Sequence, residues 1–203
     1  RITIRHCLQH RGGWDRAISG DPIGQMGEIF RTTGIPPPYD PAQIVRYMLG
    51  RPLDFEPGAR MAYSNLGYLV LGRVIAKVAG VDYEDFVRTA VLKPLGLNSL
   101  KLGKATWKDR ETDEARYHTR DNRTGLSLYD PFGPPVPYPY GAENFEGFEA
   151  HGGWIATASD LVRFADAFHD TAKCPLLKPE TIALMQARPE GESGHEADGS
   201  PKA

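Results

Sequence analysis

The strongest helical signal in the chain begins directly after Ser64–Asn65 and ends at Gly80. Between these points the apolar residues keep the spacing of one helix face: Leu66, Leu69, Val70, Val74, Ile75 and Val78. Gly67 and Gly72 lie inside this pattern, and each costs a helix about 1 kcal/mol relative to alanine. Such glycines usually let another helix or backbone segment approach closely. We therefore expect a long central helix with close neighbours at both glycines.

The other helical signals are shorter, and strand signals are few. Apolar spacing with caps and breakers predicts helices that begin near residues 3, 23, 41, 82, 159 and 179. Residues 99–102 and 115–118 could each form a brief strand. The predicted fold class is mainly α, within the α+β class. Residues 1–188 form its helical region, and residues 189–203 form a polar tail.

Residues 120–150 form an irregular segment rich in proline, tyrosine and glycine. A segment this long without regular structure inside a domain is usually a functional rim or lid. We therefore interpret residues 120–150 as an active-site loop. An alternative is a ligand for an aromatic groove, because Pro134 to Pro137 fit the P-x-x-P pattern of polyproline recognition.

Charge and hydropathy exclude several classes of partner. The formal net charge is −2, which gives no indication of a nucleic-acid surface. No apolar run reaches about 18 residues, so the sequence predicts no membrane span. The two cysteines, Cys7 and Cys174, cannot form a disulfide framework. We expect free, buried thiols, with a single bridge as the alternative.

Tyr63 and Asn65 are the residues with the clearest chemical potential. They flank Ser64 at the start of the predicted central helix, after a Pro57–Gly58 turn. In an extended conformation the two side chains project to one side, where a phenol can relay a proton and a carboxamide can hold a carbonyl. Tyr-x-Asn alone is a weak motif, because Ser64 or Asn65 could simply cap the helix.

Four segments in order give this motif a context. Ile2–Gly13, Pro57–Tyr68, Val91–Leu97 and His151–Phe164 resemble successive segments of the serine β-lactamase and penicillin-binding-protein-like hydrolases of the class C type. The resemblance implies the helical half of that fold, with a few short strands and the sheet largely missing.

The resemblance also implies roles for particular residues. Tyr63 would help to deprotonate a nucleophilic serine, and Asn65 would bind the substrate amide and help to hold a catalytic lysine. Gly152 and Gly153 would bring main chain to the pocket wall, with Trp154 behind it; plain core packing is the alternative for Trp154. The implied reaction is acyl transfer to water on a β-lactam, peptide or ester, with no metal and no cofactor.

The departures from the family pattern concern the nucleophile. No serine in the chain is followed by lysine three positions later, so the family's Ser-x-x-Lys motif is absent. It is expected before Arg1, and the Lys-Thr-Gly or His-x-Gly motif after Ala203. We therefore expect the chain alone to be inactive and to expose helix faces. Those faces would be covered by the remainder of its domain or by self-association.

Two other classes of protein fit parts of the sequence, and a third is excluded. A metal hydrolase could use His6 and His10, which have i, i+4 spacing, with His151 as a third ligand. A pseudoenzyme could retain the fold for binding after loss of the nucleophile. An α/β-hydrolase is excluded, since no Gly-x-Ser-x-Gly occurs. The DNA sequence upstream of Arg1 would separate truncation from decay.

Overall fold

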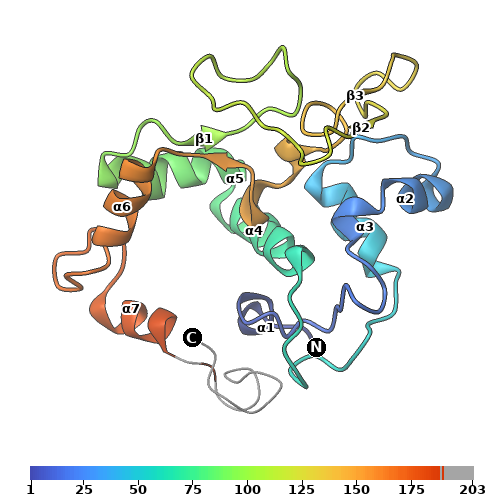
Figure 1. The fold of residues 1–203 in the computed structure, drawn as a ribbon. Coiled ribbons are helices and arrows are strands. Elements are labelled where there is room, and N and C mark those ends of the chain that lie inside the picture. The colour runs from blue at the N-terminus through green and yellow to red at the C-terminus, as the bar shows by residue number, and fades with distance from the viewer. Residues whose placement is uncertain (188, 190–203) are drawn as a thin grey trace.

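The computed structural model describes residues 1–187 and 189, and it is mostly helical (Figure 1). Seven α-helices follow in this order within the described residues: α1 Ile4–Leu8, α2 Met26–Thr33, α3 Pro41–Leu49, α4 Asn65–Ala79, α5 Tyr83–Phe86, α6 Ala158–Asp166 and α7 Pro179–Gln186. A π-helix, Val87–Leu92, continues α5. Short 3-10 turns occur at Pro22–Gly24, Lys93–Leu95, Phe145–Gly147 and Glu149–His151.

Strands are brief and form two small antiparallel sheets in the described part of the chain. β1 (Lys101–Leu102) pairs with β4 (Trp154–Ile155), with Leu102 opposite Trp154. β2 (Thr124–Gly125) pairs with β3 (Val136–Pro137), with Gly125 opposite Val136. The prediction of a mainly helical fold with a few short strands is therefore confirmed.

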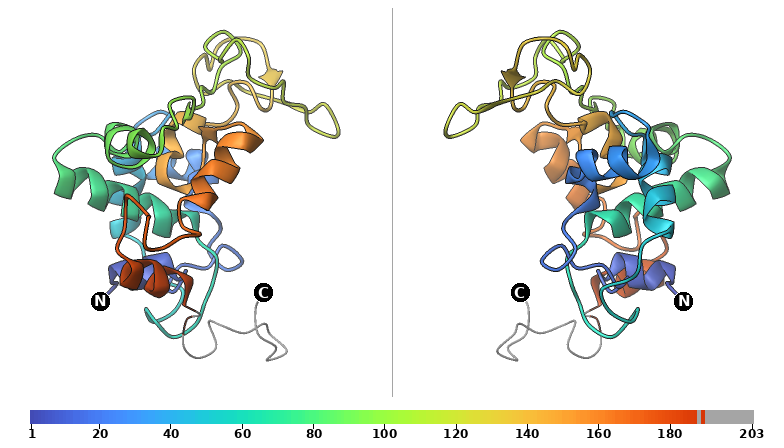
Figure 2. Two further views of the ribbon diagram at one scale, coloured as in Figure 1. Left: turned by 90° about the vertical axis from the view of Figure 1, so that its left-hand side faces the viewer. Right: turned by 90° about the vertical axis from the view of Figure 1, so that its right-hand side faces the viewer.

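Helix α4 runs through the middle of the molecule and is contacted by α1, α3, α5 and the turn Glu149–His151 (Figure 1). One buried cluster joins its N-terminal half to α2 and α3: Ile23, Ile29, Tyr39, Ile44, Tyr47, Leu66 and Leu69. A second cluster begins at the end of the π-helix: Leu92, Leu97 and Leu100. Figure 2 shows residues 105–140 as loops that stand away from this helical body.

Most predicted helix starts are observed, and their caps explain them. Thr3 accepts a hydrogen bond from the His6 amide, and Asp40 forms a capping box with Gln43 before Pro41. The predicted start of α6 at Ser159–Asp160 is late, because Thr157 is the cap and Asp160 completes its capping box. The predicted helix from Ile23 is divided at Gln25 into a 3-10 turn and α2.

Two predictions about irregular regions need correction. Residues 115–118 form no strand, since the structure leaves them without regular secondary structure. Val136–Pro137 lies in β3 and pairs with β2, so this part of the P-x-x-P segment is in a sheet rather than a free polyproline helix. Residues 120–150 thus contain a small hairpin and 3-10 turns, although most of the segment is irregular.

Both glycines of α4 lie where another segment packs closely, as expected. A Cβ on Gly67 would lie 3.3 Å from the Cys7 carbonyl oxygen of α1. A Cβ on Gly72 would lie 2.8 Å from the Ala150 Cβ, closer than real side chains approach. The absence of these two Cβ atoms therefore lets α1 and the turn Glu149–His151 contact the central helix directly.

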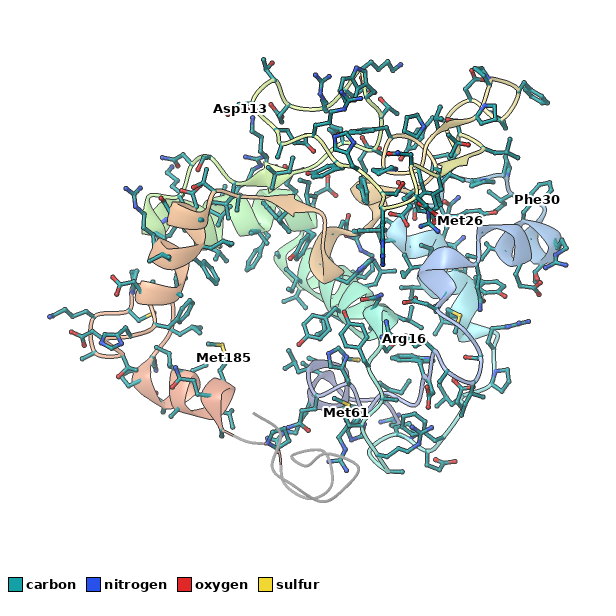
Figure 3. The ribbon with its side chains drawn as sticks, in the orientation of Figure 1. Arg16, Met26, Phe30, Met61, Asp113 and Met185 are labelled. Atoms are coloured by element: carbon teal, nitrogen blue, oxygen red, sulfur yellow. The ribbon has the colours of Figure 1, made fainter. Side chains whose placement is uncertain are left out.

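Several apolar side chains are exposed on the outer helices. On α6, Val162 is 68% exposed, and on α7, Leu184 is 66% exposed. Met185, labelled in Figure 3, is 59% exposed on the same helix. Cys7 is buried, Cys174 is half-buried, and neither takes part in a disulfide. No helix in residues 1–187 and 189 is long and apolar enough to cross a membrane.

We predict opposite effects for alanine at two helical glycines. Gly72→Ala should lower the free energy of unfolding by about 1–3 kcal/mol, because the added methyl group overpacks against Ala150. Gly27→Ala in α2 is the control, since an added Cβ there would meet nothing within 4 Å beyond its own helix backbone. That variant should gain up to about 1 kcal/mol from helix propensity. Urea denaturation of both variants measures the difference between their free energies of unfolding. Equal stabilisation would contradict the close packing of Gly72 against Ala150.

Candidate active site

Tyr63 and Asn65 meet at the N-terminal end of α4. The Tyr63 hydroxyl donates a hydrogen bond to the Asn65 Oδ1 atom at 2.9 Å. Ser64 between them is extended, with φ −143° and ψ 118°, and only 7% exposed. An extended residue sends its neighbours' side chains to the opposite side from its own. The structure thus brings together the two groups that the sequence placed on one side.

Ser64 occupies the N-cap position of α4, but its hydroxyl makes no capping hydrogen bond. Of the two residues that could cap the helix, Ser64 is therefore the one at the cap position, and it acts there through its backbone alone. Its backbone amide instead donates to the Nδ1 atom of His10 at 3.2 Å. The loop that carries Tyr63 is thus held by a residue from the start of the chain.

Asp21 fixes the other side of the Asn65 carboxamide. The Asn65 Nδ2 atom donates to the Asp21 Oδ2 atom at 2.7 Å. The other carboxylate oxygen accepts the Ile23 amide, so Asp21 also caps the turn Pro22–Gly24. Asn65 therefore has its oxygen turned to Tyr63 and its nitrogen turned to Asp21, and each of these atoms can still make one more hydrogen bond.

Tyr63 is 45% exposed, and two other side chains contact its ring. The His10 ring lies 4.6 Å from it between centroids, tilted by 34°. The Arg16 guanidinium carbon lies 4.9 Å from the Tyr63 ring centroid, a cation–π arrangement. Arg16, labelled in Figure 3, belongs to the irregular segment between α1 and α2. This places a positive charge beside the phenol.

A cavity of about 520 Å³ opens beside Asn65. Asn65, Asp21, Gly152 and Gly153 all line it, whereas Tyr63 is not among its described lining residues. The remaining wall is a mixture of apolar, aromatic and polar side chains: Ile23, Gly24, Met26, Leu128, Tyr138, Ala142, Glu143, Asn144, Phe148 and His151. Asn65 thus faces the cavity directly, whereas Tyr63 is connected to the cavity only by its hydrogen bond to Asn65.

Gly152 and Gly153 supply backbone to the cavity wall. Gly153 has φ +80°, a left-handed conformation that favours glycine. A Cβ there would also lie 2.8 Å from the Phe145 carbonyl oxygen. The Gly153 carbonyl accepts a hydrogen bond from the Gly103 amide at 2.7 Å, which continues the pairing of β1 and β4. These constraints place main chain in the wall of this cavity, and the assignment of Gly152 and Gly153 to substrate binding stays a prediction.

Trp154 lies beside this wall rather than in it. It lines a second cavity of about 420 Å³, which shares Tyr138, Glu143, Phe148 and Gly153 with the first. Trp154 also packs against the cluster around Leu92. Both interpretations of Trp154, pocket wall and core, therefore describe part of its surroundings, and its assignment to substrate binding stays a prediction.

His151 and its neighbours join the cavity to α4. Burial lowers the pKa of His151, which favours its neutral form. Its buried Nε2 atom has no hydrogen-bond partner within the described residues. The adjacent Glu149 forms an ion pair with Arg73 of α4. Burial raises the pKa of Glu149, and the charge of Arg73 opposes that shift.

The histidine pair proposed for a metal does not lie on one helix face. α1 ends at Leu8, and His10 follows with φ +53°. Its Nδ1 atom accepts the Ser64 amide, and no cluster of three His, Cys, Asp or Glu side chains that could hold a metal occurs in residues 1–187 and 189. The i, i+4 argument for His6 and His10 is therefore wrong.

Sequence reasoning misses the partners of the Tyr63–Asn65 pair. Asp21 precedes Pro22 and has the pattern of a helix cap, but nothing in the sequence indicates that it reaches Asn65. The sequence suggests only a metal ligand at His10 and gives no signal at Arg16. The contacts of Asp21 and His10 join residues separated by 44 and 54 positions, so only the fold reveals them.

Comparisons with known proteins identify the family and the fold. The sequence matches the family model described as Beta-lactamase over residues 1–200. It is 27% identical over 176 residues to penicillin-binding protein 4* of Bacillus subtilis, covering 83% of this chain and 36% of that protein.

Two solved structures resemble the fold. The octameric penicillin-binding protein homologue from Pyrococcus abyssi has a TM-score of 0.59 at 25% identity, covering 92% of this chain and 39% of the other. EstCE1, a hydrolase with promiscuous acyltransferase activity, has a TM-score of 0.61 at 26% identity, covering 92% and 50%. The chain thus spans half or less of the length of these relatives. Since the family model covers nearly all of its residues, the chain belongs to the β-lactamase family.

Proposed function

We propose that this chain provides the helical wall of a serine hydrolase active site that transfers an acyl group to water. The observation that carries the proposal is the hydrogen bond from Tyr63 to Asn65 beside a cavity of about 520 Å³. The family and its relatives, which include a penicillin-binding protein and a hydrolase, support the reaction class. The proposed substrates are β-lactams, peptides or esters.

In this proposal Tyr63 is the proton relay. Its hydroxyl proton is directed at Asn65, which leaves the phenol oxygen able to accept a hydrogen bond from an attacking serine hydroxyl. As the serine oxygen bonds to the substrate carbonyl carbon, its proton passes to the Tyr63 oxygen. The phenol's own proton turns from Asn65 to the leaving group as the bond to that group breaks, so the phenol is neutral before and after the transfer. The Arg16 guanidinium lies over the face of the Tyr63 ring in a cation–π arrangement and helps to hold the ring in place.

Asn65 is proposed to hold the substrate. Its carboxamide lines the cavity and is held in orientation by Tyr63 and Asp21. The second N–H group of the amide is free of these two bonds and can donate to a substrate carbonyl. Gly152 and Gly153 contribute to the wall of the same cavity, and Trp154 borders the neighbouring one.

The chain lacks the serine that this reaction needs. Acyl transfer requires an attacking atom, and none of its serines belongs to a Ser-x-x-Lys motif. We propose that a further segment supplies the nucleophile and covers the exposed apolar residues of α6 and α7. Self-association is the second way to cover them, and the octameric relative gives it some support. A non-catalytic binding role is the alternative that the missing motif favours.

We predict that the chain alone hydrolyses neither a chromogenic cephalosporin nor a short-chain nitrophenyl ester. The reason is the missing attacking group, so the rate should equal that of buffer containing heat-denatured chain. Spectrophotometric assays at high protein concentration measure it. Turnover that disappears in Tyr63→Phe would mean that the chain carries a nucleophile outside the Ser-x-x-Lys pattern.

We also predict that Tyr63→Phe lowers turnover by roughly 10²–10⁴ in a longer protein that joins this chain to a Ser-x-x-Lys segment, because a positioned proton-transfer group usually contributes that much. Tyr47→Phe is the matched control. Tyr47 is buried in α3, and its hydroxyl has no hydrogen-bond partner among the described residues. Steady-state kinetics should show no loss for the control, and an unchanged rate in Tyr63→Phe would remove Tyr63 from the mechanism.

A further inference from the structure

His10 makes two hydrogen bonds to the loop that carries the Tyr63–Asn65 pair. Its carbonyl oxygen accepts the Ala62 amide at 2.8 Å, and its Nδ1 atom accepts the Ser64 amide at 3.2 Å. These two amides lie on either side of Tyr63. The residue thus holds the backbone immediately before and after the proposed proton relay.

The imidazole ring of His10 also packs between two tyrosines. Its centroid lies 4.6 Å from that of Tyr63 and 5.1 Å from that of Tyr68 on α4. Tyr68 is anchored in turn, because its hydroxyl donates to the Leu8 carbonyl at the end of α1. His10 therefore sets both the backbone path and the ring position of Tyr63.

The backbone of His10 adopts a conformation that few side chains tolerate. Its φ is +53°, in the left-handed region where asparagine, aspartate and histidine are enriched. This conformation follows the end of α1 and allows the carbonyl and the ring of one residue to reach the same loop. Asparagine is the natural replacement, since it accepts this φ and offers an oxygen acceptor on a short side chain.

The bond from Ser64 requires the neutral form of the imidazole. A neutral ring has one nitrogen that accepts and one that donates, whereas a protonated ring only donates. Protonation of His10 would therefore place an N–H donor on Nδ1 facing the N–H donor of Ser64, with no acceptor between them, and the hydrogen bond would be lost. Burial lowers the pKa of His10, so the ring resists this change until the pH is below the ordinary histidine range.

The other titratable or charged groups near this loop include Tyr63, Tyr68, Arg16 and His6, together with Arg11, which donates to the Gly58 carbonyl, and Asp21, which accepts from Asn65. The two tyrosines contact the His10 ring, and Arg16 lies over Tyr63. The His6 ring lies against Gly58, farther along the same loop. Histidine is the residue type among these whose charge ordinarily changes between pH 5 and 8. His10 and His6 are therefore the two groups that an experiment must separate.

We propose that His10 is a positioning residue for the Tyr63–Asn65 pair, and that protonation of its imidazole breaks the bond to the Ser64 amide, frees the backbone beside Tyr63 and disables the site. The catalytic consequence rests on the proposed function, whereas the structural consequence does not. Because the folded-state pKa is lowered, the stabilising contribution of His10 is complete above about pH 6.5. It is lost as the pH falls through the folded-state value.

The test begins with NMR titration of the chain of 203 residues. The Ser64 amide and the ring carbons of Tyr63 should shift together with a single midpoint below about pH 6.5. Amide exchange at Ser64, corrected for its intrinsic pH dependence, should accelerate on the order of 10-fold across that midpoint, the effect of one lost hydrogen bond. A Ser64 resonance that is flat over this range would overturn the proposal.

Three variants separate positioning from general support of the fold. His10→Asn should keep Ser64 protected and abolish the titration, because the amide oxygen accepts without changing charge. His10→Ala should lose the protection at every pH. His6→Asn is the matched control and should retain the wild-type titration. A Ser64 titration midpoint that persists in His10→Asn, or that is lost in His6→Asn, would contradict the proposal. If His10→Ala does not fold, these two variants are sufficient to test it.

An activity measurement distinguishes this proposal from the proposed function. In a longer protein with a Ser-x-x-Lys segment, kcat/KM should fall on the order of 10- to 100-fold on the acid side of the same midpoint, the scale of a misplaced catalytic group. His10→Asn should remove that fall. If Ser64 and Tyr63 titrate together but Tyr63→Phe leaves the rate unchanged, only the proposed function is refuted. If Tyr63→Phe lowers the rate but Ser64 does not titrate with Tyr63, only the positioning role of His10 is refuted.

Discussion

The candidate site depends on a set of backbone hydrogen bonds between two segments that are distant in sequence. The residues after α1 offer their carbonyl oxygens to the loop before α4: Gly13 to Asp54 at 2.8 Å, Arg11 to Gly58 at 2.9 Å and His10 to Ala62 at 2.8 Å. The Arg11 side chain adds a bond to the Gly58 carbonyl. The loop is therefore fixed along its length, which sets the direction in which Tyr63 and Asn65 leave the backbone.

Helix α4 connects this fixed loop to the rest of the cavity. Its first residue is Asn65, and its two interior glycines admit α1 and the turn Glu149–His151. That turn is followed directly by Gly152 and Gly153 in the cavity wall. One helix thus carries the carboxamide at its start and contacts the turn that leads into Gly152 and Gly153, and its two interior glycines give α1 and that turn the room to pack against it.

Local signals in the sequence predict the helices well and the site only in part. The caps at Thr3 and Asp40 and the left-handed glycines at Gly34 and Gly80 act within a few residues, so they can be identified directly. The meeting of Tyr63 with Asn65 is also local, because one extended residue separates them. The contacts of Asp21 and His10 depend on how the chain returns on itself, and no nearby pattern encodes that path. The strand predicted at residues 115–118 is absent for the same reason, since a brief β signal forms a strand only where the fold provides a neighbour.

The two cavities have a common partition formed by Tyr138, Glu143, Phe148 and Gly153. The second cavity is also bordered by Tyr117 and Arg123, which do not touch the Tyr63 loop by any described hydrogen bond or ring contact. Under the proposed function, substitutions at these two residues would reshape the second cavity while the proton relay kept its geometry. Selectivity and reactivity would then be separable traits, open to independent change during divergence of the family.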